Sequence, residues 1–173
     1  DARTESVVWS DHFDATTRDF FEVQDEITSA VASRLAVQID DTERRSTASH
    51  PRDLRAYGLV LRGQHLMLQV RKEENHHARR LFEQAIEIEP GYGRAYSGMS
   101  RTHNLDWRYS WSPDPDASLD QAVAWARQAI ARDRLDARAF AELGYALLYK
   151  REIDESLAEY RRALALNPNA ADI

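Results

Sequence analysis

The stretch FAELGYALLYKREIDESLAEYRRALALNP, residues 140–168, decides the fold of this chain. Its first half places Phe140, Leu143 and Leu147 three or four residues apart, which predicts one apolar face of a helix. Gly144 lies inside that helix, where glycine costs roughly 1 kcal/mol relative to alanine, so we expect a second helix to pass very close to it. The second half supplies small residues for this contact, an aromatic ring to fill the space between the helices and a proline to end the unit: Ser156, Ala163, Tyr160 and Pro168.

This spacing resembles the tetratricopeptide repeat, a helix-turn-helix unit that recurs about every 34 residues. The resemblance implies units that stack on one another and that bind other proteins rather than catalyse reactions. An ordinary amphipathic helical hairpin is the alternative.

A second copy precedes the first one and carries an insertion. Ala129 lies 34 residues before Ala163, and the pattern of its first helix begins at Tyr96. Ten more residues separate Ser100 from Ala122 than separate the equivalent positions of the last copy. The middle unit is therefore expected to be longer than its neighbours.

The third copy is less certain in register. Its first helix, around residues 56–63, begins the pattern at either Tyr57 or Leu59, and both choices require a few extra residues before the second helix. The second helix reproduces the spacing without exception: Ala78, Phe82, Ala85 and Pro90.

Three units, at about 53–90, 93–134 and 137–168, predict a mainly α-helical protein. The expected fold is a tetratricopeptide α-solenoid, in which three hairpins form a right-handed superhelical stack. Three units are about the minimum for stability, because one hairpin cannot bury its own apolar face.

The first 52 residues differ from the repeats. Residues 6–13 are β-branched and aromatic and predict one strand, and residues 17–45 carry apolar residues at helical spacing and predict a long helix with Thr17 as its N-cap. We therefore expect two regions, residues 1–52 and residues 53–173.

The amino-terminal residues resemble a particular family. Val8–Asp14 and Phe20–Ile27 are similar to the end of the TolB-like segment that precedes tetratricopeptide repeats in bacterial class III adenylate cyclase-like proteins and in winged-helix regulators. Ala56–Tyr57, Leu61–Gly63 and Trp111–Asp114 continue the resemblance. It implies a piece of a larger protein, with an output domain before residue 1 and a fourth repeat after the third. We expect such a piece to self-associate through its exposed ends.

Composition excludes several classes of function. A formal net charge of −6 and a pI near 5.5 argue against a nucleic-acid binder, because phosphate neutralisation needs a basic surface. The chain has no cysteine, no apolar run long enough for a membrane helix and no signal pattern at its start. A cytoplasmic location is expected, with a periplasmic domain of a membrane-anchored protein as the alternative.

The sequence carries no catalytic or metal-binding pattern, and we expect neither enzymatic activity nor a cofactor. Gly91 and Gly93 lack the spacing of a phosphate loop. Residues 73–77 contain two adjacent histidines, which point in different directions on a helix, so a solvated turn with Asn75 as a helix cap is favoured over a metal site. Asp114 and Asp116 are read as turn and N-cap residues before a helix at Ala117.

The first helices of the units carry a candidate binding groove. Its expected members come from all three units: Arg62, Arg94, Arg101, Arg108, Arg138 and Tyr145. Guanidinium groups pair bidentately with carboxylates, so an acidic peptide or an acidic protein surface is the expected partner. The alternative is that these arginines only form pairs within their own helices, with Asp106 or Glu142. Chaperone docking is not expected, because Ser97, Gly98 and Glu142 replace residues of the carboxylate clamp.

The insertion, residues 105–118, is rich in aromatic residues. Trp107, Tyr109 and Trp111 either form an exposed binding patch or cover the apolar edge of the neighbouring unit, and the second reading is favoured because large rings are mostly buried. The expected function is thus a non-catalytic interaction or regulatory module of an adenylate cyclase-like or transcription-regulatory protein. The alternative is an effector-sensing domain with a small-molecule pocket between residues 1–52 and the first repeat.

Overall fold

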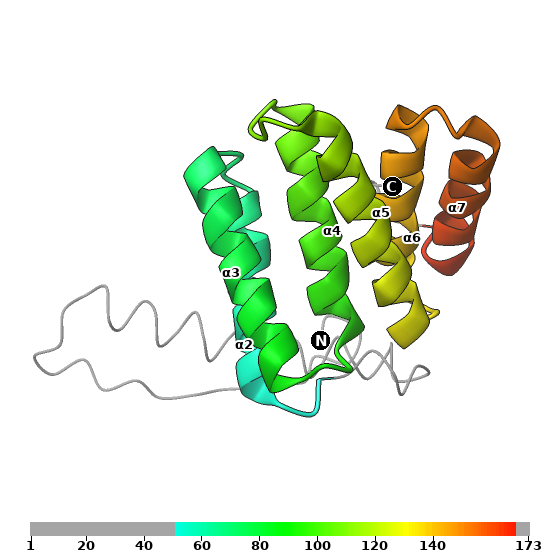
Figure 1. The fold of residues 1–173 in the computed structure, drawn as a ribbon. Coiled ribbons are helices and arrows are strands. Elements are labelled where there is room, and N and C mark those ends of the chain that lie inside the picture. The colour runs from blue at the N-terminus through cyan, green and yellow to red at the C-terminus, as the bar shows by residue number, and fades with distance from the viewer. Residues whose placement is uncertain (1–50, 169–173) are drawn as a thin grey trace, which may run out of the picture. The chain divides into compact units, whose positions relative to one another are not determined.

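The computed structural model describes residues 51–168, which consist of six α-helices and their connections (Figure 1). These six helices belong to one compact unit. The strand and the long helix expected within residues 6–45 lie outside the described residues. The bounds of the helices are α2 (Leu54–Met67), α3 (Lys72–Ile88), α4 (Gly93–Arg108), α5 (Pro115–Arg132), α6 (Ala137–Tyr149) and α7 (Ile153–Leu166).

The six helices form three hairpins, α2–α3, α4–α5 and α6–α7, which follow one another through the unit (Figure 1). Each helix packs against its hairpin partner, and the second helix of one hairpin packs against the first helix of the next. The first helices also contact each other, α2 with α4 and α4 with α6. The expected α-solenoid fold is confirmed, with α4 at its centre.

The insertion lengthens both helices of the middle hairpin. Helix α4 has 16 residues and α5 has 18, compared with 13 in α6 and 14 in α7. The Asp114 side chain accepts a hydrogen bond from the Ala117 N–H, which confirms Asp114 as an N-cap. Helix α5 starts at Pro115, two residues earlier than expected, because proline fits the first turn of a helix. Asp116 therefore lies in the first turn of α5, so the expectation that it precedes the helix is wrong.

Glycine allows close contact between the two helices of the first and last hairpins. A Cβ atom on Gly144 would lie 3.0 Å from the Tyr160 ring, so the expected close passage of a helix at this residue is confirmed. A Cβ atom on Gly63 would lie 2.6 Å from the Phe82 ring. Each contact joins a glycine of the first helix to the aromatic residue of the second, which makes the two glycines equivalent.

This equivalence fixes the register of the first unit. Leu59 precedes Gly63 by four residues, just as Phe140 precedes Gly144. Leu59 rather than Tyr57 is therefore the first position of the pattern in α2.

In the middle and last hairpins, a buried serine hydroxyl joins the two helices by a hydrogen bond, but the serine lies on a different helix in each. Ser156 on α7 donates a hydrogen bond of 2.7 Å to the backbone oxygen of Gly144 on α6. In the middle hairpin the serine is on the first helix, where Ser100 donates a hydrogen bond of 2.8 Å to the backbone oxygen of Ala122. Both hydroxyls are buried and hydrogen-bonded, so each stabilises a close helix pair without leaving a polar atom unpaired.

Candidate partner-binding site

Five of the six expected binding residues lie on two neighbouring helices. Helices α4 and α6 are in contact, and we call the face that these five residues mark the arginine face. Its members are Arg94, Arg101 and Arg108 on α4 and Arg138 and Tyr145 on α6.

Arg62, the sixth expected residue, lies apart from the arginine face. With Leu59 as the first position of its unit, Arg62 takes the place that Met99 and Leu143 hold in the later units. Met99 and Leu143 are buried in hydrophobic clusters that include residues of the preceding hairpin, whereas Arg62 is exposed.

A carboxylate lies within the arginine face, between its two helices. The Nε atom of Arg101 is 4.0 Å from Oε1 of Glu142, and the Asn104 amide donates hydrogen bonds to Oε2 of Glu142 (2.9 Å) and to its backbone oxygen (3.1 Å). Burial raises the pKa of Glu142, while Asn104, Arg101 and Arg138 act in the opposite direction. The Arg101 pair therefore joins two helices, unlike the pairing within one helix that was the alternative to a binding groove.

A second carboxylate lies at the amino-terminal end of α6. Asp136 is the N-cap of this helix and accepts a hydrogen bond of 3.0 Å from the Arg138 N–H. Burial raises the pKa of Asp136, and the nearby charge of Arg94 opposes this shift. Arg94, Arg101 and Arg138 thus all lie near a buried carboxylate.

Arg108, at the other end of the face, has aromatic neighbours instead. Its guanidinium carbon lies 5.7 Å from the centre of the Tyr109 ring, and the nearby phenol groups of Tyr145, Tyr109 and Tyr149 raise its pKa. Among residues 51–168, no carboxylate forms an ion pair with Arg108.

Three aromatic rings pack together beside Arg108. The ring centre of Tyr149 lies 4.0 Å from that of Trp107 and 4.7 Å from that of Tyr145, and the Trp107 and Tyr145 rings meet edge to face at 6.4 Å. Burial raises the pKa of the Tyr145 phenol to about 12. Tyr149 was not expected in the site, although it follows Tyr145 by one helical turn and so lies on the same face of α6.

The aromatic residues of the insertion separate into two groups. Trp107 packs on α6 and covers the edge of the neighbouring unit, as favoured from the sequence. Tyr109 and Trp111 stack on each other at 5.0 Å, and Tyr109 remains 41% exposed. Arg108 adjoins both groups, so the insertion and the arginine face meet at this residue.

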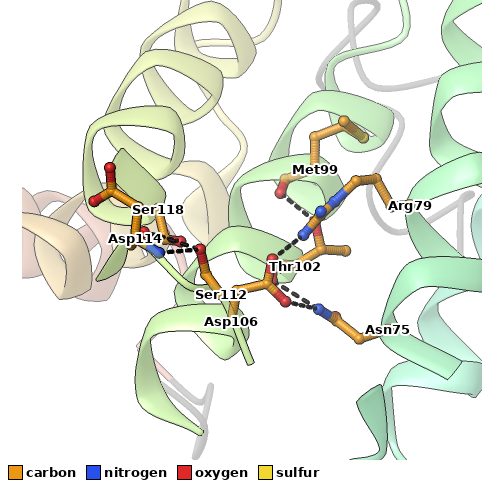
Figure 2. Close-up of polar contacts among 8 residues, drawn as sticks. All are labelled: Asn75, Arg79, Met99, Thr102, Asp106, Ser112, Asp114 and Ser118. Atoms are coloured by element: carbon orange, nitrogen blue, oxygen red, sulfur yellow. Dashed lines mark hydrogen bonds and ion pairs between the residues drawn. The ribbon is translucent and has the colours of Figure 1, made fainter. Parts of the chain in front are cut away.

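A largely buried polar network joins α3 to α4 (Figure 2). Asp106 accepts hydrogen bonds from Arg79 (2.6 Å) and from the Asn75 amide (2.8 Å), and Asn75 also donates to the backbone oxygen of Thr102 (2.9 Å). Asn75 is 1% exposed and lies inside α3, so the expectation that it caps a helix in a solvated turn is wrong. Its hydrogen-bonding partner Asp106 is 31 residues away in sequence, which is why local spacing could not reveal this role.

Two further features of the described residues bear on function. Within residues 51–168, no group of three or more histidine, cysteine, aspartate or glutamate residues is placed to hold a metal ion. None of the helices that the structure describes has both the length and the apolar character needed to cross a membrane.

The family comparison agrees with this geometry. Residues 137–170 match the family model described as tetratricopeptide repeat. Residues 137–170 form a tetratricopeptide repeat. This finding confirms the family to which the sequence of residues 140–168 pointed, whereas the TolB-like resemblance of the first residues stays a prediction.

Solved structures show the same fold. The NMR structure of the first TPR domain of the human RPAP3 protein matches with a TM-score of 0.56 and 17% identity, over 68% of this chain and 82% of that one. A structure described as "First TPR of Spaghetti (RPAP3) bound to HSP90 peptide SRMEEVD" matches with a TM-score of 0.54 and 18% identity, over 70% of this chain and 86% of that one. At these identities the likeness establishes the tetratricopeptide fold alone.

One curated relative comes from Rhizobium meliloti (strain 1021) and is named "Putative adenylate cyclase 3". It is 30% identical over 157 residues, which make up 90% of this chain and 27% of the relative. The chain thus spans about a quarter of the length of that relative.

Proposed function

We propose that this chain is a non-catalytic interaction module that regulates a larger adenylate cyclase-like or transcription-regulatory protein. The tetratricopeptide fold supports an interaction role, because a stack of such hairpins presents the side chains of its first helices on a continuous surface. The similarity to a protein named as an adenylate cyclase supports the regulatory setting.

The arginine face is the proposed binding surface. The observation that carries this proposal is that contact between α4 and α6 brings four guanidinium groups and a tyrosine together from two units. An acidic segment of a partner protein fits this chemistry, since each guanidinium group offers several N–H donors in a planar fork. Arg101 keeps donors for such a ligand, because its contact with Glu142 is long, at 4.0 Å, and its side chain is 30% exposed.

The solved structure with a bound HSP90 peptide supports an acidic partner only in part. That peptide, SRMEEVD, is acidic, so a fold of this kind can hold an acidic segment. In this chain Gly98 offers no side chain, Ser97 is buried, and Glu142 stands where the carboxylate clamp needs a basic or amide side chain. We therefore propose an acidic partner other than a chaperone tail.

Binding of labelled peptides to the 173-residue chain tests the proposal. Fluorescence anisotropy would compare a peptide rich in aspartate and glutamate with a peptide of the same length rich in lysine. We expect the acidic peptide to bind, with an affinity that falls as salt is raised.

Paired substitutions localise the binding. Arg101→Gln with Arg138→Gln is expected to weaken binding of the acidic peptide by about tenfold or more, as expected for the loss of two charge-assisted contacts. Arg80→Gln with Arg127→Gln is the matched control, because both arginines are exposed on second helices. Equal affinity of the two double variants would contradict the proposed face, and preferential binding of the basic peptide would contradict the proposed partner.

A further inference from the structure

The end of the arginine face at Arg108, beside Tyr109 and Tyr149, differs from the rest of that face in two ways. Tyr109 and Tyr149 remain 41% and 42% exposed, although large rings are usually covered. Both rings belong to packed aromatic groups, Tyr109 with Trp111 and Tyr149 with Trp107 and Tyr145. The rings are thus held in place while part of their surface faces solvent, which suits a binding surface because little side-chain entropy is lost on binding.

The charge at this end is also different. Arg101 contacts Glu142, and Arg79 is paired with Asp106 in the network of Figure 2, whereas Arg108 has no ion pair with a carboxylate among the described residues. The Tyr109 ring, 5.7 Å from the guanidinium carbon, orients Arg108 without neutralising it. Arg108, which lies near the exposed rings of Tyr109 and Tyr149, is therefore available to a ligand carboxylate.

These two features together define the ligand. We propose that Arg108, Tyr109 and Tyr149 form an anchor subsite for an aromatic side chain that stands next to an aspartate or glutamate in the partner protein. The aromatic side chain would pack edge to face or offset on the exposed tyrosines, and the carboxylate would pair with the guanidinium group of Arg108. A basic ligand is disfavoured, because Arg108 would repel it. This inference rests on the proposed function and names the residue type that the arginine face selects.

The ten-residue insertion explains why this subsite is found in the middle unit. The longer α4 carries Trp107 and Arg108 in its last turn, and the chain continues through Tyr109 to Trp111 before α5 begins at Pro115. The shorter α6 ends at Tyr149, and its last turn supplies the opposing rings. The subsite is built from the insertion on one side and a neighbouring unit on the other.

Three labelled peptides tested on the 173-residue chain examine this inference. The first is a peptide of aspartate and glutamate with one central tryptophan, the second has alanine in place of the tryptophan, and the third has leucine there. We expect the tryptophan peptide to bind at least about tenfold more tightly than the alanine peptide and clearly more tightly than the leucine peptide. Arg108→Glu and the pair Tyr109→Ala with Tyr149→Ala should each remove this preference, whereas Arg127→Glu on the exposed side of α5 should keep it.

Indole N–H resonances in the unaltered protein give a second readout that needs no variant to fold. The tryptophan peptide should shift the signals of Trp107 and Trp111, and it should leave that of Trp125 unchanged because Trp125 packs against Tyr96 on another part of the stack.

These peptides and variants distinguish failure of the aromatic subsite from failure of the arginine face. Binding of all three acidic peptides with equal affinity, weakened by Arg101→Gln with Arg138→Gln, would overturn the aromatic subsite and leave the arginine face intact. A tryptophan preference that survives Arg108→Glu and the double tyrosine variant would also overturn the subsite. Failure of every acidic peptide to bind would overturn both proposals.

Discussion

At the scale of single residues, two glycines of α2 stand in different surroundings. A Cβ atom on Gly63 would lie 2.6 Å from the Phe82 ring, whereas one on Gly58 would meet nothing within 4 Å. The Phe82 ring has little room to move away from Gly63, because it also packs closely on Gly98 of the next hairpin, where an added Cβ would lie 2.7 Å from the same ring. Replacement by alanine is therefore expected to have opposite effects on stability at Gly63 and at Gly58.

Gly63→Ala is expected to destabilise the protein by about 1–3 kcal/mol, the usual range for overpacking. Gly58→Ala on the same helix should stabilise it by about 0.5–1 kcal/mol, because alanine is the better helix former. Urea unfolding of both variants measures these changes. Equal effects of the two substitutions would show that the Phe82 ring does not fill the space beside Gly63.

His103 predicts a pH dependence of stability. Burial, and next the charge of Arg79, lower its pKa from 6.5 to about 4, while Asp106 acts in the opposite direction. The unfolded chain therefore binds a proton between pH 6.5 and pH 4 that the folded chain does not, so stability should fall as the pH is lowered through this window. The loss is expected to reach about 2 kcal/mol near pH 4, after allowance for the partial exposure of this side chain.

Unfolding by urea across this pH range, compared with His103→Gln, measures the contribution of the histidine. The variant should show a shallower fall in stability than the unaltered chain. Parallel pH profiles of the two proteins would show that His103 does not cause the fall in stability. The carboxyl groups of Asp136 and Glu142 could not account for that fall either, because their raised pKa values increase stability as the pH is lowered.

At the scale of helices, the close contact between the two helices of a hairpin is not formed by the same residue pair in all three hairpins. The first and last hairpins combine a glycine on the first helix with an aromatic ring on the second, Gly63 with Phe82 and Gly144 with Tyr160. The middle hairpin has Ser100 on the first helix, and the residue equivalent to those rings is the small Ala126. At this contact a hairpin therefore has either a serine on its first helix or an aromatic ring on its second helix, but not both.

Gly144→Ser is expected to destabilise the chain by about 1–3 kcal/mol, because the new side chain meets the Tyr160 ring. Adding Tyr160→Ala should recover part of that loss, since the last hairpin then has the small-residue pairing of the middle one. A double-mutant cycle by thermal or urea unfolding measures the coupling. Additive effects would show that the two positions do not share one space.

The sequence revealed the contacts that depend on spacing within a hairpin and missed those that depend on side-chain direction between hairpins. The Gly144 and Ser156 pair was visible because small residues at these intervals point to one helix contact. The Arg101 and Glu142 contact joins two units, so helical periodicity alone suggested a pair within one helix. The burial of Asn75 could not be inferred either, because Asp106 and Thr102 come from a helix of the following hairpin.

At the scale of the whole molecule, the last hairpin presents apolar side chains that the earlier hairpins cover. Leu157 is 47% exposed, whereas Val123, its equivalent in the middle unit, is 9% exposed beneath the next hairpin. Ile153 and Leu164 of α7 are also exposed, at 46% and 45%. The self-association expected from the sequence stays a prediction. The exposed apolar face of α7 is the surface through which we expect it to occur.

Light scattering at rising protein concentration measures self-association. A mass above that of one chain is expected at high concentration, and Leu157→Glu with Leu164→Glu should return it to that of a monomer, because charges oppose burial of this face. A monomeric mass of the unaltered chain throughout would contradict the prediction.

We propose that acidic segments bind to α4 and α6. Titration of the chain with the acidic tryptophan peptide, followed by backbone amide chemical shifts, tests this proposal. We expect shifts concentrated on the arginine face and on residues 107–111, with little change along α3, α5 and α7. Shifts spread evenly over the unit, or concentrated on those second helices, would contradict it.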